Sequence, residues 1–190
     1  MNPSQHFQCS KQCCSYTVIP YYQISPYIHD HNGNNGNNGN GKLKKSGSFM
    51  YDKKTNKILL VQSRGQLWGP PKGTIQNDEN PLECAIREVK EETGITIRED
   101  VLHDSTTIKS KALYYFLEVN IDEYKVEPQH HIKDNDANGI GWFNVDCLDE
   151  LIDTQKISIN QHCRILIKKI FNKDIVFNVS HLKKRLLPLM

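Results

Sequence analysis

The chain has 190 residues and a mass of 21.9 kDa, about the length of one domain. Hydrophobic residues make up 37% of it and charged residues 24%, and no apolar run approaches the ~20 residues of a membrane span, which favours a soluble protein without a membrane partner. The net charge of +2 is too small to require a nucleic-acid partner, and the polar residues 1–11 do not resemble a secretory signal, so we expect an intracellular, cytoplasmic protein.

Residues 1–45 are predicted to form an arm that precedes the folded domain. Residues 15–22 have the aromatic and β-branched content of a strand, although Pro20 would confine it to a sheet edge. Residues 32–41 contain only Asn and Gly, so nothing offsets the entropy of ordering them, and we predict a flexible low-complexity loop.

The arm also holds a group of cysteines and histidines, which are residue types that bind zinc. The group comprises Cys9, Cys13, Cys14, His6, His29 and His31. Its Cys-x3-Cys spacing has no matching downstream pair, so we favour a polar arm that contains free thiols over a zinc site. The remaining cysteines are scattered, and a reducing compartment argues against disulfides. They are Cys84, Cys147 and Cys163.

The folded domain is predicted to cover residues 46–155. Residues 48–51 and 57–62, joined by a polar turn, have the pattern of a β-hairpin. Further strands are predicted at residues 113–119 and 139–143, and a short helix near 145–151. Strands and helices are therefore mixed along the chain without regular alternation.

The clearest helix is predicted at residues 81–93. Asn80 suits the N-cap, Pro81 suits the first turn, and Glu83 completes a capping box. Gly94 can adopt the left-handed conformation that ends helices. The helix has a buried stripe at the i, i+3, i+4, i+7 spacing, formed by Leu82, Ala85, Ile86 and Val89.

Three glutamates, Glu88, Glu91 and Glu92, share another face of this helix. Because like charges oppose each other there, a cation is a better explanation than a structural purpose, and Mg²⁺ or Mn²⁺ prefers such oxygen ligands. Arg87 lies four residues before Glu91 and can pair with it. A solvated charged helix face is the ordinary alternative.

Residues 73–95 follow the pattern Gly-x5-Glu-x7-Arg-Glu-apolar-x-Glu-Glu-x-Gly-apolar, which resembles the Nudix box of the Nudix hydrolase superfamily at every specified position. The resemblance implies an α/β (α+β) fold, an α/β/α sandwich around a mixed sheet. It also implies that Glu88, Glu91 and Glu92 bind metal, with Glu91 and Glu92 catalytic, and that the Gly73 carbonyl is a further ligand. Glu79 and Arg87 match a structural pair.

The resemblance extends over residues 47–151 and implies further site residues. The segment from Trp68 to Gly73 resembles the mRNA-decapping and diadenosine tetraphosphate hydrolase branches. Lys72 can meet a phosphate, whereas Trp68 either stacks a base or belongs to the core. Both branches carry a glutamate as ligand or base where this chain has Asp136, and Asp134 is a close competitor.

Residues 156–190 are predicted to be a basic C-terminal extension with an amphipathic helix at 159–171. Arg164, Lys168 and Lys169 lie on its polar side and are candidates for RNA contact, although a packed helix with a solvated charged face is the simpler interpretation.

The resemblance implies cleavage of a nucleoside diphosphate linked to another group, X, by metal-activated water. We favour capped RNA as substrate, with release of 7-methyl-GDP, and see no firm evidence for protein partners. Diadenosine tetraphosphate, another nucleotide or a diphosphoinositol is the alternative, and a non-catalytic nucleotide-binding module is a third. Because residues 1–45 contain no helical regulatory region, a stripped-down relative such as those of large DNA viruses is expected.

Overall fold

The computed structural model describes residues 5–19, 43–63, 66–102, 104–129 and 137–173. Its strands are β1 (Gln5–Gln8), β2 (Ser15–Val18), β3 (Lys45–Asp52), β4 (Lys57–Ser63), β5 (Leu67–Gly69), β6 (Lys72–Thr74), β7 (Ser105–Ile108), β8 (Ala112–Glu118), β9 (Ala137–Asn144) and β10 (Ser158–Ile159). Its helices are α1 (Pro81–Thr93), α2 (Leu148–Asp153) and α3 (Gln161–Phe171), with 3-10 turns η2 (Glu99–Val101), η3 (Ile121–Glu123) and η4 (Val145–Cys147).

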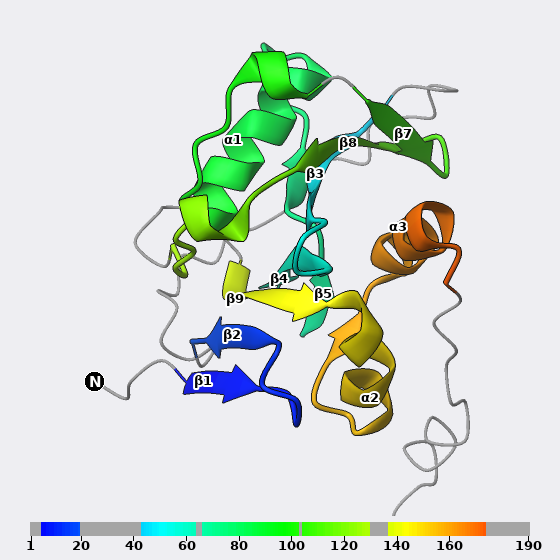
Figure 1. The fold of residues 1–190 in the computed structure, drawn as a ribbon. Coiled ribbons are helices and arrows are strands. Elements are labelled where there is room, and N and C mark those ends of the chain that lie inside the picture. Colours follow the sequence, from blue (N-terminus) through cyan, green and yellow to red (C-terminus); the bar gives the residue numbers. More distant parts are fainter. Residues whose placement is uncertain (1–4, 20–42, 64–65, 103, 130–136, 174–190) are drawn as a thin grey trace, which may run out of the picture.

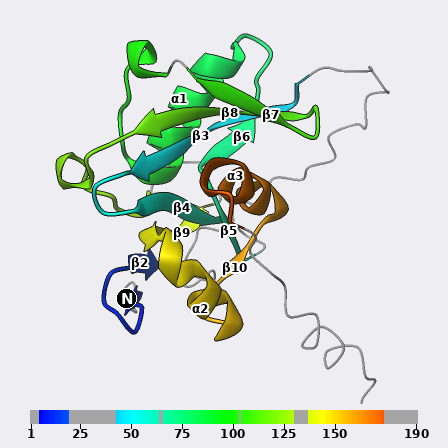
Figure 2. The same ribbon diagram turned by 45° about the vertical axis from the view of Figure 1, so that its right-hand side comes forward.

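The strands form one mixed sheet of ten strands. Its main path runs β1-β2-β9-β4-β3-β8-β7, with β5 beside β4, β10 beside β5, and β6 beside β3. The pairs β3–β8 and β10–β5 are parallel and the others are antiparallel. Figure 1 shows this sheet between α1 on one side and α3 on the other, and Figure 2 shows α2 and α3 lying over the same face. The predicted α/β/α sandwich is thereby confirmed.

The period of two along the strands divides the core between the two faces of the sheet. In β4, Ile58 and Leu60 join the cluster beneath α2 and α3, whereas Leu59 and Val61 join the cluster beneath α1. All four side chains are almost fully buried. Because both faces are covered, β4 has the continuous apolar sequence of a central strand rather than an alternating one.

The elements predicted from periodicity are confirmed with small shifts of their ends. The hairpin is β3–β4, the later strands are β8 and β9, and the short helix is η4 followed by α2. The C-terminal helix begins at Gln161 rather than at residue 159, because Asn160 is its N-cap and accepts a hydrogen bond from the Cys163 N–H at 2.9 Å.

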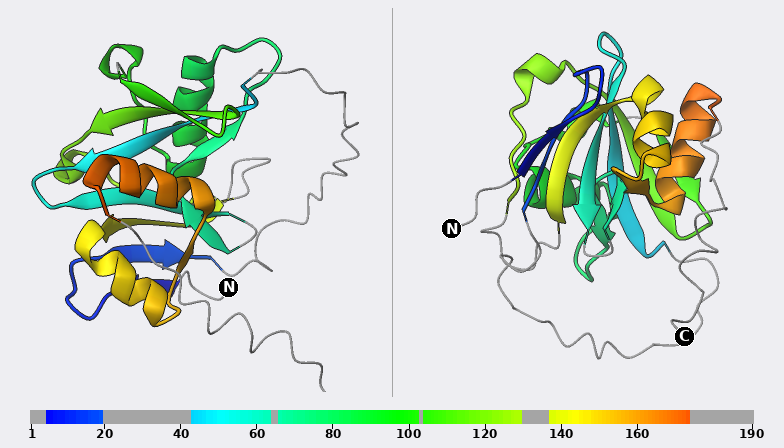
Figure 3. Two further views of the ribbon diagram at one scale, coloured as in Figure 1. Left: turned by 90° about the vertical axis from the view of Figure 1, so that its right-hand side faces the viewer. Right: turned by 90° about the horizontal axis from the view of Figure 1, so that it is seen from below.

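The strand predicted at residues 15–22 is confirmed for β2, which pairs with β9 and carries β1 on its outer side. The strands β1 and β2 therefore belong to the sheet and not to a separate arm (Figure 3). Pro20 and the Asn-Gly run at 32–41 fall outside the described residues.

The C-terminal helix also belongs to the folded domain. Cys163, Leu166 and Ile167 of α3 are fully buried against the sheet, so residues up to 173 are a layer of the sandwich and not an appended tail. In the described part of the chain, every helix is too short or too polar to span a bilayer.

Candidate active site

The ends of α1 are fixed by local hydrogen bonds. The Asn80 side chain accepts from the N–H groups of Leu82 and Glu83 at 2.8 and 3.0 Å, and the Glu83 carboxylate accepts from the Asn80 N–H at 2.7 Å. Gly94 ends the helix at φ 77°, in the left-handed region, and donates to the Lys90 carbonyl. The predicted capping box and stop are confirmed, and they set which side chains face the sheet.

The apolar face of α1 packs on the sheet through the predicted stripe. Ala85 and Val89 are fully buried, and Leu82 and Ile86 are half-buried against the same cluster. The buried set also contains polar members that the stripe did not predict, namely Cys84, Glu88, Glu92 and Thr93. Two carboxylates of α1 are thus enclosed between the helix and the neighbouring strands.

Arg87 forms hydrogen bonds with three glutamate side chains. Its guanidinium forms a two-pronged pair with Glu79, with Nε–Oε2 at 2.9 Å and Nη2–Oε1 at 2.6 Å. Its Nη1 donates to Glu88 Oε1 at 2.7 Å and to Glu91 Oε2 at 2.8 Å. The predicted pairing of Arg87 with Glu91 is confirmed, and the same cation also holds Glu79 and Glu88.

The pairing shifts the pKa values of both partners. Hydrogen bonds from Arg87 lower the pKa of Glu79 to about 2, although burial opposes the shift. The hydrogen bond with Glu79 raises the pKa of Arg87, and the charges of Glu88 and Glu91 add to this. Glu79 and Arg87 therefore stay fully ionised at neutral pH and fix the loop that precedes α1.

Gly73 of β6 allows the strand to approach α1 closely. A Cβ at this position would lie 1.9 Å from Glu88 Oε1, so any side chain would push the carboxylate away. The Gly73 carbonyl oxygen lies 3.9 Å from Cys84 Sγ, on the α1 side of the strand. Glycine at this position therefore lets the Glu88 carboxylate lie against the backbone of β6.

Glu92 faces the residue before this glycine. Its Oε2 accepts a hydrogen bond from the Lys72 N–H at 2.9 Å, and the residue is 5% exposed. The three carboxylates therefore have different partners. Arg87 bridges Glu88 and Glu91, whereas Glu92 is bonded to the backbone of β6.

The donor set of this surface fits a hard divalent cation. Glu79, Glu88, Glu91 and Glu92 contribute four formal negative charges and Arg87 one positive charge, so the group has a formal charge of −3. Carboxylate and carbonyl oxygens are the ligands that Mg²⁺ and Mn²⁺ prefer. Glu88, Glu91, Glu92 and the Gly73 carbonyl would hold such an ion.

The structure decides between the two interpretations of Trp68, whereas it does not describe Asp136. Trp68 is 1% exposed, and its ring makes edge contacts with Tyr16 and Phe143 at centroid distances of 5.4 and 4.9 Å. The indole therefore fits the core alternative and leaves no open face for a base. Asp136 and its competitor Asp134 lie outside the described residues.

The predicted basic residues of α3 have separate environments. Arg164 is half-buried and donates from Nε to the Ile159 carbonyl at 3.3 Å, whereas Lys168 and Lys169 are exposed. The Lys169 ammonium contacts the Thr106 hydroxyl of β7. Lys168 and Lys169, rather than Arg164, present charge to solvent.

A histidine that the sequence did not single out connects α3 to β8. His162 Nδ1 lies 2.9 Å from the Tyr114 hydroxyl, and Tyr114 of β8 is fully buried. Burial lowers the pKa of His162, and so do the positive charges of Lys72, Lys109 and Lys45. Basic residues from β3, β6 and the β7–β8 turn therefore lie near the start of α3. They are far apart in the sequence and come together only through the fold.

The chain is similar to known proteins. The family model described as "NUDIX domain" matches residues 44–162. "Putative hydrolase 111R" of Invertebrate iridescent virus 3 is 31% identical over 159 residues, which cover 82% of this chain and 88% of that protein.

Two enzymes with named substrates are also similar to the chain. The "m7GpppN-mRNA hydrolase" of Saccharomyces cerevisiae is 35% identical over 113 residues, or 54% of this chain and 11% of that protein. The mouse "Bis(5'-nucleosyl)-tetraphosphatase [asymmetrical]" is 37% identical over 86 residues, or 40% of this chain and 58% of that protein. The chain thus spans about a tenth of the yeast enzyme and just over half of the mouse enzyme.

Proposed function

Because the chain belongs to the Nudix hydrolase family, we propose that it cleaves a pyrophosphate bond in a nucleoside diphosphate linked to another group, with Mg²⁺ or Mn²⁺ bound at α1. The observation that carries the proposal is the enclosed carboxylate surface between α1 and β6. Glu88 and Glu92 are 9% and 5% exposed, and the missing side chain of Gly73 leaves room for the Glu88 carboxylate.

The residues of this surface have distinct tasks in the proposed reaction. Glu88, Glu91 and Glu92 hold the divalent ions, together with the Gly73 carbonyl. Arg87 orients Glu88 and Glu91 by charge-assisted hydrogen bonds, and Glu79 anchors Arg87 from the opposite side. The Lys72 N–H donates to one oxygen of Glu92 and so orients this carboxylate, which serves as ligand or proton acceptor in the proposed reaction.

Bound divalent ions would neutralise the negative charge of the pyrophosphate oxygens and would lower the pKa of the attacking water. The chain's own carboxylates accept the proton that the water loses, with Glu91, Glu92 and Asp136 as the candidates. Lys72 adds positive charge on the β6 side, where a substrate phosphate is expected. No covalent bond to the protein is needed.

Capped RNA is the substrate that we favour within this class. The similarity to the yeast m7GpppN-mRNA hydrolase supports it, and so do the exposed lysines Lys168 and Lys169 on α3. The similarity to the mouse tetraphosphatase supports a second candidate, a dinucleoside tetraphosphate. A non-catalytic module is disfavoured because every glutamate of the box is present and Arg87 holds three of them.

A direct comparison of substrates distinguishes these candidates. The full chain is incubated with Mn²⁺ and either cap-labelled RNA or diadenosine tetraphosphate, and the products are separated by chromatography. We expect release of 7-methyl-GDP from the RNA with a kcat/KM at least about tenfold above that for the dinucleotide, a difference of about 1.4 kcal/mol in transition-state binding. Preference for the dinucleotide would reverse the assignment of X.

The exposed lysines of α3 give a second test. Lys168 and Lys169 are changed together to Ala, while Arg164 stays because it donates to Ile159 near the helix start. If both lysines contact phosphates, KM for capped RNA rises and the slope of log KM against log salt falls by roughly 1.4. A matched pair, Lys53→Ala with Lys54→Ala in the exposed β3–β4 turn, should leave the slope unchanged. Equal slopes in both double variants would make α3 a packing element only.

A further inference from the structure

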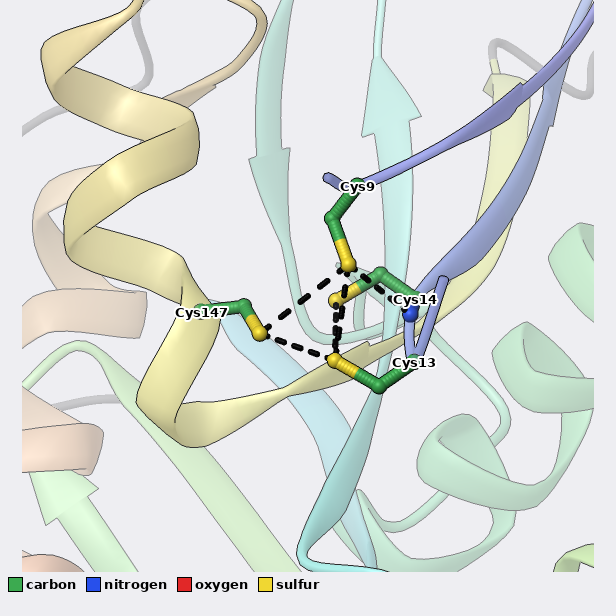
Figure 4. Close-up of side chains that lie close together, drawn as sticks. All are labelled: Cys9, Cys13, Cys14 and Cys147. Atoms are coloured by element: carbon green, nitrogen blue, oxygen red, sulfur yellow. Dashed lines mark hydrogen bonds between the residues drawn. The ribbon is translucent and has the colours of Figure 1, made fainter. Parts of the chain in front are cut away.

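Four cysteines from distant parts of the sequence meet beside β9 (Figure 4). Cys9, Cys13 and Cys14 come from the turn between β1 and β2, and Cys147 ends η4, next to α2. Their sulfurs all lie within 4.8 Å of one another. In the part of the chain that the structure describes, this is the one group of three or more His, Cys, Asp or Glu ligand atoms gathered so closely.

The distances between the sulfurs lie around the value expected for a shared tetrahedral metal, with the Cys13–Cys147 pair about 1 Å shorter. Cys9 Sγ lies 3.4 Å from Cys13 Sγ and 4.0 Å from Cys147 Sγ. Cys13 Sγ lies 4.0 Å from Cys14 Sγ and 2.8 Å from Cys147 Sγ. Four thiolates at about 2.3 Å from one zinc ion stand about 3.8 Å apart. Modest side-chain rotations would therefore place an ion at the centre of the group.

The backbone around the group supports thiolate ligands. The Cys14 N–H donates to Cys9 Sγ at 3.4 Å, and the Asn144 N–H donates to Cys14 Sγ at 3.3 Å. Such N–H groups stabilise negative charge on sulfur. The turn folds back on itself because the Gln12 N–H donates to the Cys9 carbonyl at 2.9 Å, with Gln12 in the left-handed region at φ 57°.

The protein encloses the four sulfurs. Cys9, Cys14 and Cys147 are at most 3% exposed, and Cys13 is half-buried. Zinc binds the deprotonated form of cysteine, so an ion at the centre of the group would supply the counter-charge that enclosed thiolates require.

We propose that Cys9, Cys13, Cys14 and Cys147 bind one structural Zn²⁺ that fastens the β1–β2 hairpin to η4 and α2. All four ligand positions are filled by protein, as in structural rather than catalytic zinc sites. Among the described strands β1 pairs only with β2, and its four residues are exposed, so a metal ion would add a fastening to a strand with little packing of its own. The Ser10 hydroxyl, which donates to the Glu150 carboxylate, is a second link across the same junction.

The histidines that the sequence places near these cysteines are not needed in this site. His6 Nδ1 lies 2.9 Å from the Thr17 hydroxyl, across the β1–β2 pair. His29 and His31 lie outside the described residues. The fourth ligand is instead Cys147, which is separated from Cys14 by 133 positions in the sequence.

The test uses the full chain purified under reducing conditions, and two matched variants. Cys147→Ala removes one proposed ligand, and Cys163→Ala removes an equally buried cysteine of α3 outside the group. We expect about one zinc per chain in the wild type and in Cys163→Ala, measured by mass spectrometry of the metal. Cys147→Ala should bind zinc more weakly by roughly 100-fold or more and should unfold at a lower temperature.

Cobalt titration of the wild type keeps the proposal testable even if Cys147→Ala does not fold. Co²⁺ in the site should give thiolate charge-transfer bands and the visible absorption of a tetrahedral ion, which carboxylate-bound cobalt at α1 cannot give. A reduced wild type without these bands would overturn the proposal. So would unchanged zinc affinity in Cys147→Ala, or a Cys13–Cys147 disulfide in the protein as isolated from cells.

Discussion

Glu92→Gln is expected to lower kcat by roughly 10²- to 10⁴-fold with little change in the unfolding temperature. The fold should survive because Gln keeps an oxygen that accepts the Lys72 N–H, which holds Glu92 at 2.9 Å. The loss removes one negative charge from the metal-binding surface and one candidate for proton acceptance, and the expected range is that of removing a general base or a charge that stabilises the transition state.

The control for this variant lies on the same helix. Glu83→Gln also removes one negative charge from α1, but Gln can replace Glu in a capping box, so both stability and turnover should stay near wild-type values. Initial rates with Mn²⁺ on the preferred substrate measure both variants. Glu92→Gln with wild-type kcat would exclude Glu92 from the catalytic site.

Arg87→Met is expected to lower the free energy of unfolding by about 2–4 kcal/mol and to abolish most activity. The change leaves Glu79 without its counter-charge and releases Glu88 and Glu91 to repel each other. The side chains of Arg87 and Glu79 are 24% and 12% exposed, so solvent screening keeps the loss below that of a fully buried pair.

A second substitution separates the charge effect from lost packing. Adding Glu79→Gln to Arg87→Met removes the unpaired carboxylate, so urea unfolding should show partial recovery of stability. Lys90→Met, an exposed change on the same helix, should cost at most about 0.5 kcal/mol. If Arg87→Met and Lys90→Met were equally stable, the pair with Glu79 would contribute nothing measurable.

The free energy of unfolding should depend on pH through the Arg87–Glu79 ion pair. The pKa of Glu79 is about 2 in the folded chain against an ordinary value of 4.5, so its ionised form stabilises the fold above pH 4.5. This contribution, roughly 3 kcal/mol at most, is lost as the pH falls from 4.5 toward 2. The difference in stability between wild type and Arg87→Met should therefore be constant near neutral pH and shrink below pH 4.5.

The features of α1 could be predicted because their causes are local in sequence. Asn80, Glu83 and Gly94 set the helix ends through bonds to near neighbours, and the box spacing places Arg87 within reach of Glu91. The same local logic predicted the β3–β4 hairpin, whose strands are joined by a short polar turn.

Features that depend on topology escaped prediction from the sequence. The short strands β5, β6 and β10 are too brief to show a period, and Cys147 meets the cysteines of the first hairpin only because β2 pairs with β9. Trp68 had two interpretations because the sequence does not distinguish a buried tryptophan from an exposed one. Its burial depends on contacts with Tyr16 and Phe143, which lie on two other strands, β2 and β9. His162 reaches Tyr114 for the same reason.

Hydrolysis in water enriched in the heavy oxygen isotope tests the central proposal most directly. The full chain is incubated with Mn²⁺ and cap-labelled RNA, and the products are weighed by mass spectrometry. Attack by water on a phosphorus of the pyrophosphate predicts one heavy oxygen in one of the two products of each cleavage, and no cleavage when a chelator removes the metal. Equal cleavage in the presence of the chelator, or products without the heavy oxygen, would contradict the proposed reaction.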